Sequence, residues 1–286
     1  KKRLLVSMSI AFLVPLIILS VYFHFQFNQT MKNSGKLHLI SLAESLTNTI
    51  DLFLQERVVN IFNLFHGEGS KLNPAQQDMN KYLRNLIETS DAFVDVGFLN
   101  KSGHKKGYAG PFPYLHEKDY SKEGWFIALM NQTENYYISD IYMGFRNKPH
   151  FTIAVKQLVD NDIDVMWATR DPGRFYLFLR TIERGRGVKA ALINKKGEYQ
   201  VVDPGQGKPL AQSYYKPSVS SGSGVDEIEK NGKSELAACA WLSEVPWFLS
   251  IKQLLNIAYA EMYKARRIII VASFLVIMMI LSVILF

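Results

Sequence analysis

Two long apolar segments, one near each end of the chain, constrain its architecture more than any other feature. Residues 4–27 carry no charge apart from that of a protonated His24, and residues 268–286 carry none. An α-helix needs about 20 apolar residues to cross the hydrocarbon core of a membrane. We therefore predict one transmembrane helix at 4–27 and a second at 268–286, with residues 28–267 together on one side of the membrane.

The start of the chain indicates which side that is. A cleaved signal peptide would have a shorter apolar core of about 7–15 residues and a small-residue cleavage site, and no Ala-x-Ala follows residue 27. The basic sequence Lys1-Lys2-Arg3 favours a cytoplasmic N-terminus. We expect a protein of the bacterial inner (cytoplasmic) membrane, with residues 28–267 in the periplasm or outside the cell. The chain ends on apolar Phe286, so we also expect a cytoplasmic portion beyond it.

Composition excludes several function classes. The net charge is +7, but the basic residues are dispersed, which is not the clustered basic face of a nucleic-acid-binding protein. A single cysteine, Cys239, allows no intrachain disulfide, and the six histidines lack metal-ligand spacing. No P-loop or Gly-x-Ser-x-Gly motif is present. We expect no enzyme activity, metal or cofactor in this chain.

The region between the apolar segments begins with a helix and then alternates in type. Leu39, Ala43, Leu46, Ile50 and Phe53 form a heptad seam, which predicts a stalk helix over 30–66. This seam can pack on the following domain, form a homodimer, or do both. Next come strand candidates, one of them at 136–143, and turns in a larger and a smaller module. The predicted parts are a distal module at 73–170, a connecting helix at 171–185, a proximal module at 186–253 and an exit helix at 254–267.

Several short motifs in this order resemble the double Cache (dCache) family of extracytoplasmic sensor domains. They are Asp119 to Phe126, Ile138 to Tyr142, Asp171 to Phe175, Lys195 to Glu198, and Pro246 to Phe248. The resemblance covers residues 30–267. It implies an α+β fold with two PAS-like Cache modules, each an antiparallel sheet, on a long N-terminal helix flanked by the two transmembrane helices.

The resemblance also implies a ligand site in the distal module. The residues that match the family's pocket positions, or that supply charge beside them, are Tyr120, Glu123, Trp125, Phe126, Asp140, Tyr142 and Asp171. The amino-acid-binding branch has an arginine where this chain has Glu123, with Lys122 beside it, so the family's carboxylate clamp is not matched at this position. Aromatic walls attract cations, and with the acidic residues they favour an amine or amino-acid-like ligand. Aspartate is also a common helix N-cap, so Asp171 has a second interpretation. Arg146 and Lys148 are alternative pocket residues, but we expect both to be exposed turn residues.

These features predict the ligand-sensing region of a bacterial transmembrane receptor. The output domain is expected to be a histidine kinase, because the stalk segments 43–45 and 50–57 resemble such kinases. A chemoreceptor and a cyclic-dinucleotide enzyme are alternatives. A two-span periplasmic assembly protein, such as a polysaccharide chain-length regulator, is an alternative of another class, although such proteins are dominated by long helices.

Overall fold

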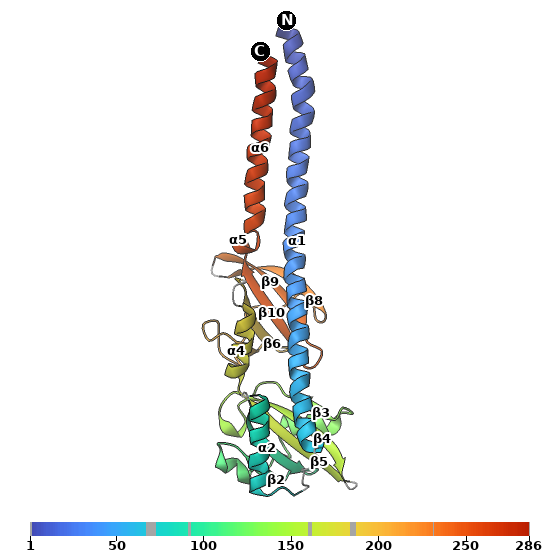
Figure 1. Ribbon diagram of the computed structural model, residues 1–286, viewed down its shortest axis with the longest axis vertical. Coiled ribbons are helices and arrows are strands. Elements are labelled where there is room, and N and C mark those ends of the chain that lie inside the picture. Colours follow the sequence, from blue (N-terminus) through green and yellow to red (C-terminus); the bar gives the residue numbers. More distant parts are fainter. Residues whose placement is uncertain are drawn as a thin grey trace.

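The computed structural model describes residues 2–66, 73–90, 93–159, 162–183, 187–230 and 232–285. The molecule is elongated, and both termini lie at the same end (Figure 1). A single helix, α1, runs along most of its length, and two sheets follow one another along that helix. The helices are α1 (Lys2–His66), α2 (Gln76–Thr89), η1 (Pro113–Glu117), α3 (Gly124–Asn131), η2 (Gly144–Arg146), α4 (Pro172–Glu183), α5 (Leu255–Ala258) and α6 (Ala260–Leu285).

Each sheet has five strands that all pair antiparallel. The distal sheet has the order β2-β1-β5-β4-β3 and the proximal sheet the order β7-β6-β10-β9-β8. The strands are β1 (Phe93–Asn100), β2 (Lys105–Ala109), β3 (Tyr136–Ile138), β4 (Phe151–Val159), β5 (Asp162–Arg170), β6 (Lys189–Asn194), β7 (Tyr199–Val202), β8 (Ser223–Lys230), β9 (Lys233–Trp241) and β10 (Trp247–Leu254). The predicted α+β class with two antiparallel sheets on a long helix is confirmed.

The seam of the stalk helix is buried against both sheets. Leu39, Ala43 and Ile50 are at most 1% exposed, and the core they form includes residues of the distal and proximal sheets. The seam therefore serves packing within the chain, the first of its two predicted uses. A dimer through α1 would have to use the opposite face, where Leu52 and Val59 are exposed. The homodimer stays a prediction.

The second face of each sheet is covered separately, because successive side chains of a strand point to opposite faces. On β5, Met166 and Ala168 face the core shared with α1, whereas Val165 and Trp167 face a second cluster beneath α3. On β10, Leu249 and Ile251 face α1, whereas Phe248 belongs to a third cluster with buried Cys239. The two sheets thus present separate outer faces, and each outer face has its own hollow.

One helix of the described residues is long and apolar enough to cross a membrane, at Met262–Ser282, and no residue of its apolar 18-residue window is buried. It overlaps the predicted second span. The predicted first span, residues 4–27, forms the start of α1, and its crossing of a membrane stays a prediction. α1 and α6 lie side by side (Figure 1), and Ser20 Oγ donates a hydrogen bond to Ser273 Oγ at 3.3 Å. The ends of three predicted segments lie outside the described residues: 184–185 of the connecting helix, 186 of the proximal module and 286 of the second span.

Several elements differ from the sequence prediction. The strand predicted at 136–143 ends at Ile138, and Tyr142 instead forms an isolated bridge with His150. The exit helix breaks at Tyr259, between α5 and α6. The edge strands β2 and β8 were not predicted.

Candidate functional site

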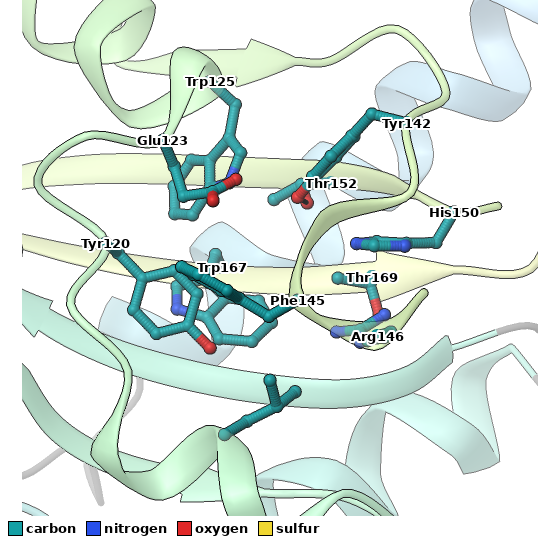
Figure 2. Close-up of a pocket in the computed structure, with 11 residues that line it drawn as sticks. Tyr120, Glu123, Trp125, Tyr142, Phe145, Arg146, His150, Thr152, Trp167 and Thr169 are labelled. Carbon is teal, nitrogen blue, oxygen red and sulfur yellow. Dashed lines mark hydrogen bonds between the residues drawn. The ribbon is translucent and has the colours of Figure 1, made fainter. Parts of the chain in front are cut away.

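A partly enclosed pocket lies on the outer face of the distal sheet, with a cavity volume of about 10 Å³ and about 250 Å³ of empty space when its mouth is included. We call it the distal pocket. Figure 2 shows its side chains converging from the sheet and from the loops that cross it. The lining residues are Leu115, Tyr120, Glu123, Trp125, Tyr142, Phe145, Arg146, His150, Thr152, Trp167 and Thr169.

Two glycines make the close packing of these aromatic side chains possible. Gly97 on β1 lies opposite Trp167 on β5, and a Cβ on Gly97 would overlap the indole ring. Gly144 has a φ of +48°, which favours glycine. A Cβ there would lie 2.7 Å from the Tyr142 ring and 2.9 Å from His150 Cε1. The turn at Gly144 therefore brings η2 over the sheet and places the next residues, including Arg146, against the pocket.

Arg146 is paired with a carboxylate beneath the pocket. Its Nη2 atom lies 2.5 Å from both oxygens of Asp95, which is 0% exposed. Asp95 also accepts hydrogen bonds from Thr169 Oγ1 at 2.6 Å and Tyr108 Oη at 3.0 Å. Arg146 Nη1 donates to Thr169 Oγ1 as well. The guanidinium charge is thus balanced inside the protein.

Glu123 is the charge in the pocket that lacks such a balance. It is the N-cap residue of α3 and is partly buried, and no described group donates a hydrogen bond to its carboxylate. Burial raises the pKa of Glu123. His150 does not offset the charge, because burial and the nearby Arg146 lower the pKa of this histidine to about 4. The carboxylate of Glu123 is therefore the ionisable acid that lines the distal pocket without a described counter-charge.

The pocket also contains buried donors that nothing in the described structure satisfies. Tyr120 Oη, Trp125 Nε1, Trp167 Nε1 and Arg146 Nε have no hydrogen-bond partner. Buried polar atoms are normally paired, and an unpaired one carries a desolvation cost. A ligand with hydrogen-bond acceptors can satisfy these donors, while its cationic end faces Glu123.

Four of the seven predicted site residues line the pocket: Tyr120, Glu123, Trp125 and Tyr142. Phe126 is buried beside them in the same cluster but does not line the cavity. Asp171 lies outside it, is exposed, and accepts a hydrogen bond from Gly173 N at 2.7 Å at the start of α4. This geometry agrees with the N-cap interpretation of Asp171. The ligand-binding role of each of the seven predicted site residues stays a prediction.

Asp140 also lies away from the pocket, at the contact between the two modules. Its carboxylate accepts hydrogen bonds from Trp247 Nε1 at 2.6 Å and Asn194 Nδ2 at 3.1 Å, both on the proximal sheet. The neighbouring Ile141 N donates to Gln200 Oε1 at 2.6 Å. Tyr142, which lines the distal pocket, follows Ile141 directly in sequence. The segment Asp140-Ile141 therefore links the pocket to the proximal module.

Replacing Asp140 with alanine is expected to destabilise the protein without weakening ligand binding in the distal pocket. The change leaves the buried indole N–H of Trp247 unpaired and removes two charge-assisted bonds, at a cost of about 2–3 kcal/mol. Thermal unfolding of the full chain in detergent, with ligand titration at a temperature where it is folded, measures both effects. Asp171→Ala is the matched control, since its exposed cap contributes about 1 kcal/mol or less. A large loss of affinity with unchanged stability would place Asp140 in the binding site after all.

The expectation for Arg146 is wrong, because this residue is 7% exposed and lines the pocket, whereas Lys148 is exposed as predicted. The sequence reasoning also missed His150, Thr152, Trp167 and Thr169. Strand alternation is the signal that could have found Trp167 and Thr169, which are two residues apart on β5. Arg146 follows Gly144-Phe145 in a polar turn and gives no such signal.

No protein-family model and no curated protein sequence matches the chain. Its fold does match solved structures over most of its length. The ligand-binding domain of the Pseudomonas fluorescens chemoreceptor CtaA, in complex with L-isoleucine, has a TM-score of 0.63 and 16% identity, covering 82% of this chain and 98% of that one. The extracellular domain of the putative histidine kinase rpHK1S-Z16 has a TM-score of 0.56 and 18% identity, covering 80% and 96%.

A third match is the ligand-binding domain of the Pseudomonas aeruginosa amino acid chemoreceptor PctB in complex with L-Arg. Its TM-score is 0.59 at 17% identity, and the alignment covers 81% of this chain and 92% of that one. All three are sensor domains of receptors. The resemblance of the sequence to double Cache sensor domains is therefore confirmed at the level of the fold.

Proposed function

We propose that this chain, which has the double Cache fold, is the ligand-sensing region of a bacterial transmembrane receptor and that its distal pocket binds a small amine. The observation that carries the proposal is the carboxylate of Glu123, which has no counter-cation in a pocket walled by Tyr120, Trp125 and Tyr142. A buried charge needs an opposite charge, and aromatic faces favour cations. The unpaired indole and phenol donors suit an acceptor at the other end of the ligand.

The three matching sensors support the receptor role. Two of them are described in complex with amino acids, which carry an ammonium group. This chain differs in presenting an acidic group at Glu123, whose charge favours the ammonium end of a ligand over a carboxylate. We therefore place amines ahead of dicarboxylates as the ligand class.

The layout of the helices supports a membrane receptor. α6 contains the apolar helix Met262–Ser282, and the adjacent part of α1 exposes large apolar side chains to the surroundings. These include Ile10, Ile18, Val21, Phe23 and Phe25. Exposed apolar surface of this extent marks contact with a membrane or a partner. We infer two spans in the bacterial inner membrane, with the sheets outside the cytoplasm.

We infer a cytoplasmic output domain beyond α6, with a histidine kinase as the first candidate. The matched kinase sensor and the stalk segment support this choice, and the two matched chemoreceptor sensors favour the alternative. Ligand binding would shift the segment at Tyr142, and the Asp140 contact would pass that shift to the proximal module and α6. Such a signal requires only that the ligand bind one of two arrangements more tightly.

Isothermal titration of the full chain in detergent tests the ligand class. The panel contains monoamines, diamines, amino acids and dicarboxylates at one ionic strength. We expect saturable binding of at least one amine and none of the dicarboxylates. Tight binding of a dicarboxylate, with no response to any amine or amino acid, would reject the proposed ligand class while leaving the receptor fold intact.

A further inference from the structure

The proximal module carries a second hollow, on the side of the sheet where β10 meets α5. It has a volume of about 1050 Å³ including its mouth. Four lysines line it, at positions 189, 230, 233 and 252, together with Tyr214 and one carboxylate, Glu235. We call this site the lysine pocket. Four ammonium groups against one carboxylate leave an excess of three positive charges at neutral pH.

The strand register places these lysines in like-charged pairs. Lys189 on β6 is directly opposite Lys252 on β10, and Lys230 on β8 is directly opposite Lys233 on β9. Like charges directly opposite each other in an antiparallel pair are destabilising. Two such pairs around one hollow are the arrangement expected where an anion balances the charge.

Lys252 is the central residue of the set. It is 4% exposed, and its Nζ atom has no hydrogen-bond partner in the described structure. Its Nζ lies 3.8 Å from the centre of the Tyr214 ring, and Lys230 Nζ lies 3.6 Å from the same ring. Glu235 accepts a hydrogen bond from Tyr214 Oη at 3.0 Å. One aromatic ring thus holds two ammonium groups beside the hollow.

The ammonium of Lys252 remains mostly protonated near neutral pH. Its pKa is lowered to about 8, chiefly by burial, with smaller contributions from Glu235, which raises it, and from Lys230 and Lys189, which lower it. A buried charge without a full partner is costly. Three hydrogen-bond donors on this ammonium are available to an anion that enters the pocket.

We propose that the lysine pocket binds a phosphate group. A free phosphate or a phosphate monoester carries about −1.5 to −2 charges at neutral pH and at least three strong acceptor oxygens, whereas the phosphodiester of a phospholipid carries about −1 and has two such oxygens. A free phosphate or a monoester therefore matches the charge excess better than a single carboxylate does. Lysine serves as a point charge for phosphate, so four flexible ammonium groups suit this ligand.

The position of the pocket allows two sources for the phosphate. Leu254 and Ile257 line it, and the apolar helix begins only five residues later, at Met262. Five residues span at most ~18 Å even when extended. The pocket therefore lies close enough to the membrane surface for a phospholipid headgroup to reach it, and it is also open to a free phosphate or a small phosphate ester.

The test uses the full chain in nanodiscs of phosphatidylcholine or of phosphatidylglycerol. Binding of radiolabelled inorganic phosphate is measured by equilibrium dialysis, and thermal unfolding is followed with phosphate or with chloride at equal ionic strength. In phosphatidylcholine we expect phosphate to bind and to raise the unfolding temperature. In phosphatidylglycerol, weaker phosphate binding together with a higher starting unfolding temperature would identify the lipid headgroup as the ligand. Unchanged phosphate binding would identify a soluble phosphate.

Lys252→Met is the decisive variant, because methionine replaces most of the length of the side chain and removes the buried charge. We expect it to unfold at the same or a higher temperature in chloride, and to lose at least tenfold in phosphate affinity. Lys196→Met, an exposed change in a turn of the same module, is the matched control and should keep the response. If Lys252→Met does not fold, the double variant Lys230→Gln, Lys233→Gln replaces it.

The proposal is overturned if neither phosphate nor phosphatidylglycerol stabilises the protein beyond chloride and phosphatidylcholine. It is equally overturned if the response to phosphate persists in Lys252→Met.

Discussion

Replacing Arg146 with methionine is expected to lower the free energy of unfolding by about 3–5 kcal/mol. The change removes the partner of Asp95, which is 0% exposed and lies 2.5 Å from the guanidinium. Breaking one side of a buried ion pair leaves an uncompensated charge in the interior, and this is the source of the loss. For a chain of this size the thermal midpoint should fall by roughly 6–20 °C. Thermal unfolding in detergent measures it.

A second substitution and a pH series show whether the unpaired carboxylate of Asp95 causes the loss of stability. Adding Asp95→Asn to Arg146→Met should recover much of the loss, because the amide stays hydrogen-bonded without a charge. Burial already raises the pKa of Asp95 in the folded wild type, although Arg146 lowers it, so losing Arg146 raises this pKa further. The loss should therefore grow as the pH rises from the folded pKa of Asp95 in wild type towards the higher folded pKa in the variant, and shrink as the pH falls.

Arg180→Met, an exposed change on α4, is the matched control and should alter stability by about 0.5 kcal/mol or less. A loss in Arg146→Met that neither Asp95→Asn nor low pH relieves would mean that Arg146 stabilises through packing on Phe112 and Trp167 instead.

The architecture could be predicted from sequence because its signals are periodic. The heptad spacing from Leu39 to Phe53 indicated a long helix with one buried face, and the buried strands β4, β5 and β10 showed runs of apolar residues. The edge strands were missed for a physical reason. β8 reads SGVDEIEK and β2 begins with two lysines, since charged residues protect an edge from further pairing and hide the apolar alternation.

The distal pocket could be predicted only in part. Tyr120, Glu123, Trp125 and Tyr142 come from short segments whose motifs resemble a family. Asp140 and Asp171 lie in the expected segments, but their carboxylates already have other partners, Trp247 and the start of α4. Which groups a carboxylate contacts depends on the tertiary structure, and no local sequence pattern encodes those contacts. The lysine pocket was missed for the same reason, because the register of four strands brings its lysines together.

Replacing Glu123 with glutamine is expected to weaken amine binding about 30- to 150-fold. Removing one member of a largely desolvated charge pair costs about 2–3 kcal/mol or more, and each 1.4 kcal/mol is a factor of ten. Titration calorimetry with the tightest amine of the panel measures the change. Glu117→Gln is the matched control, because Glu117 is exposed at the end of η1 and does not line the pocket. Equal affinity in wild type and Glu123→Gln would remove Glu123 from the binding site.

The pH dependence of amine binding shows whether Glu123 acts through its charge or through the shape of its side chain. Burial raises the pKa of this carboxyl, so amine affinity should fall as the pH drops through that raised value, because the carboxylate is then protonated while the amine stays charged. His150 contributes nothing between pH 8 and pH 5, since its pKa is lowered to about 4. Glu123→Gln should abolish the pH dependence.

The variant Glu123→Arg tests the role of the charge by reversing its sign. This position holds an arginine in the amino-acid-binding branch of the family that the sequence resembles, and a guanidinium there would face Tyr120 and Trp125. We expect the variant to lose amine binding and to gain binding of carboxylates. If it binds amines as tightly as wild type does, the negative charge in the distal pocket does not select the ligand.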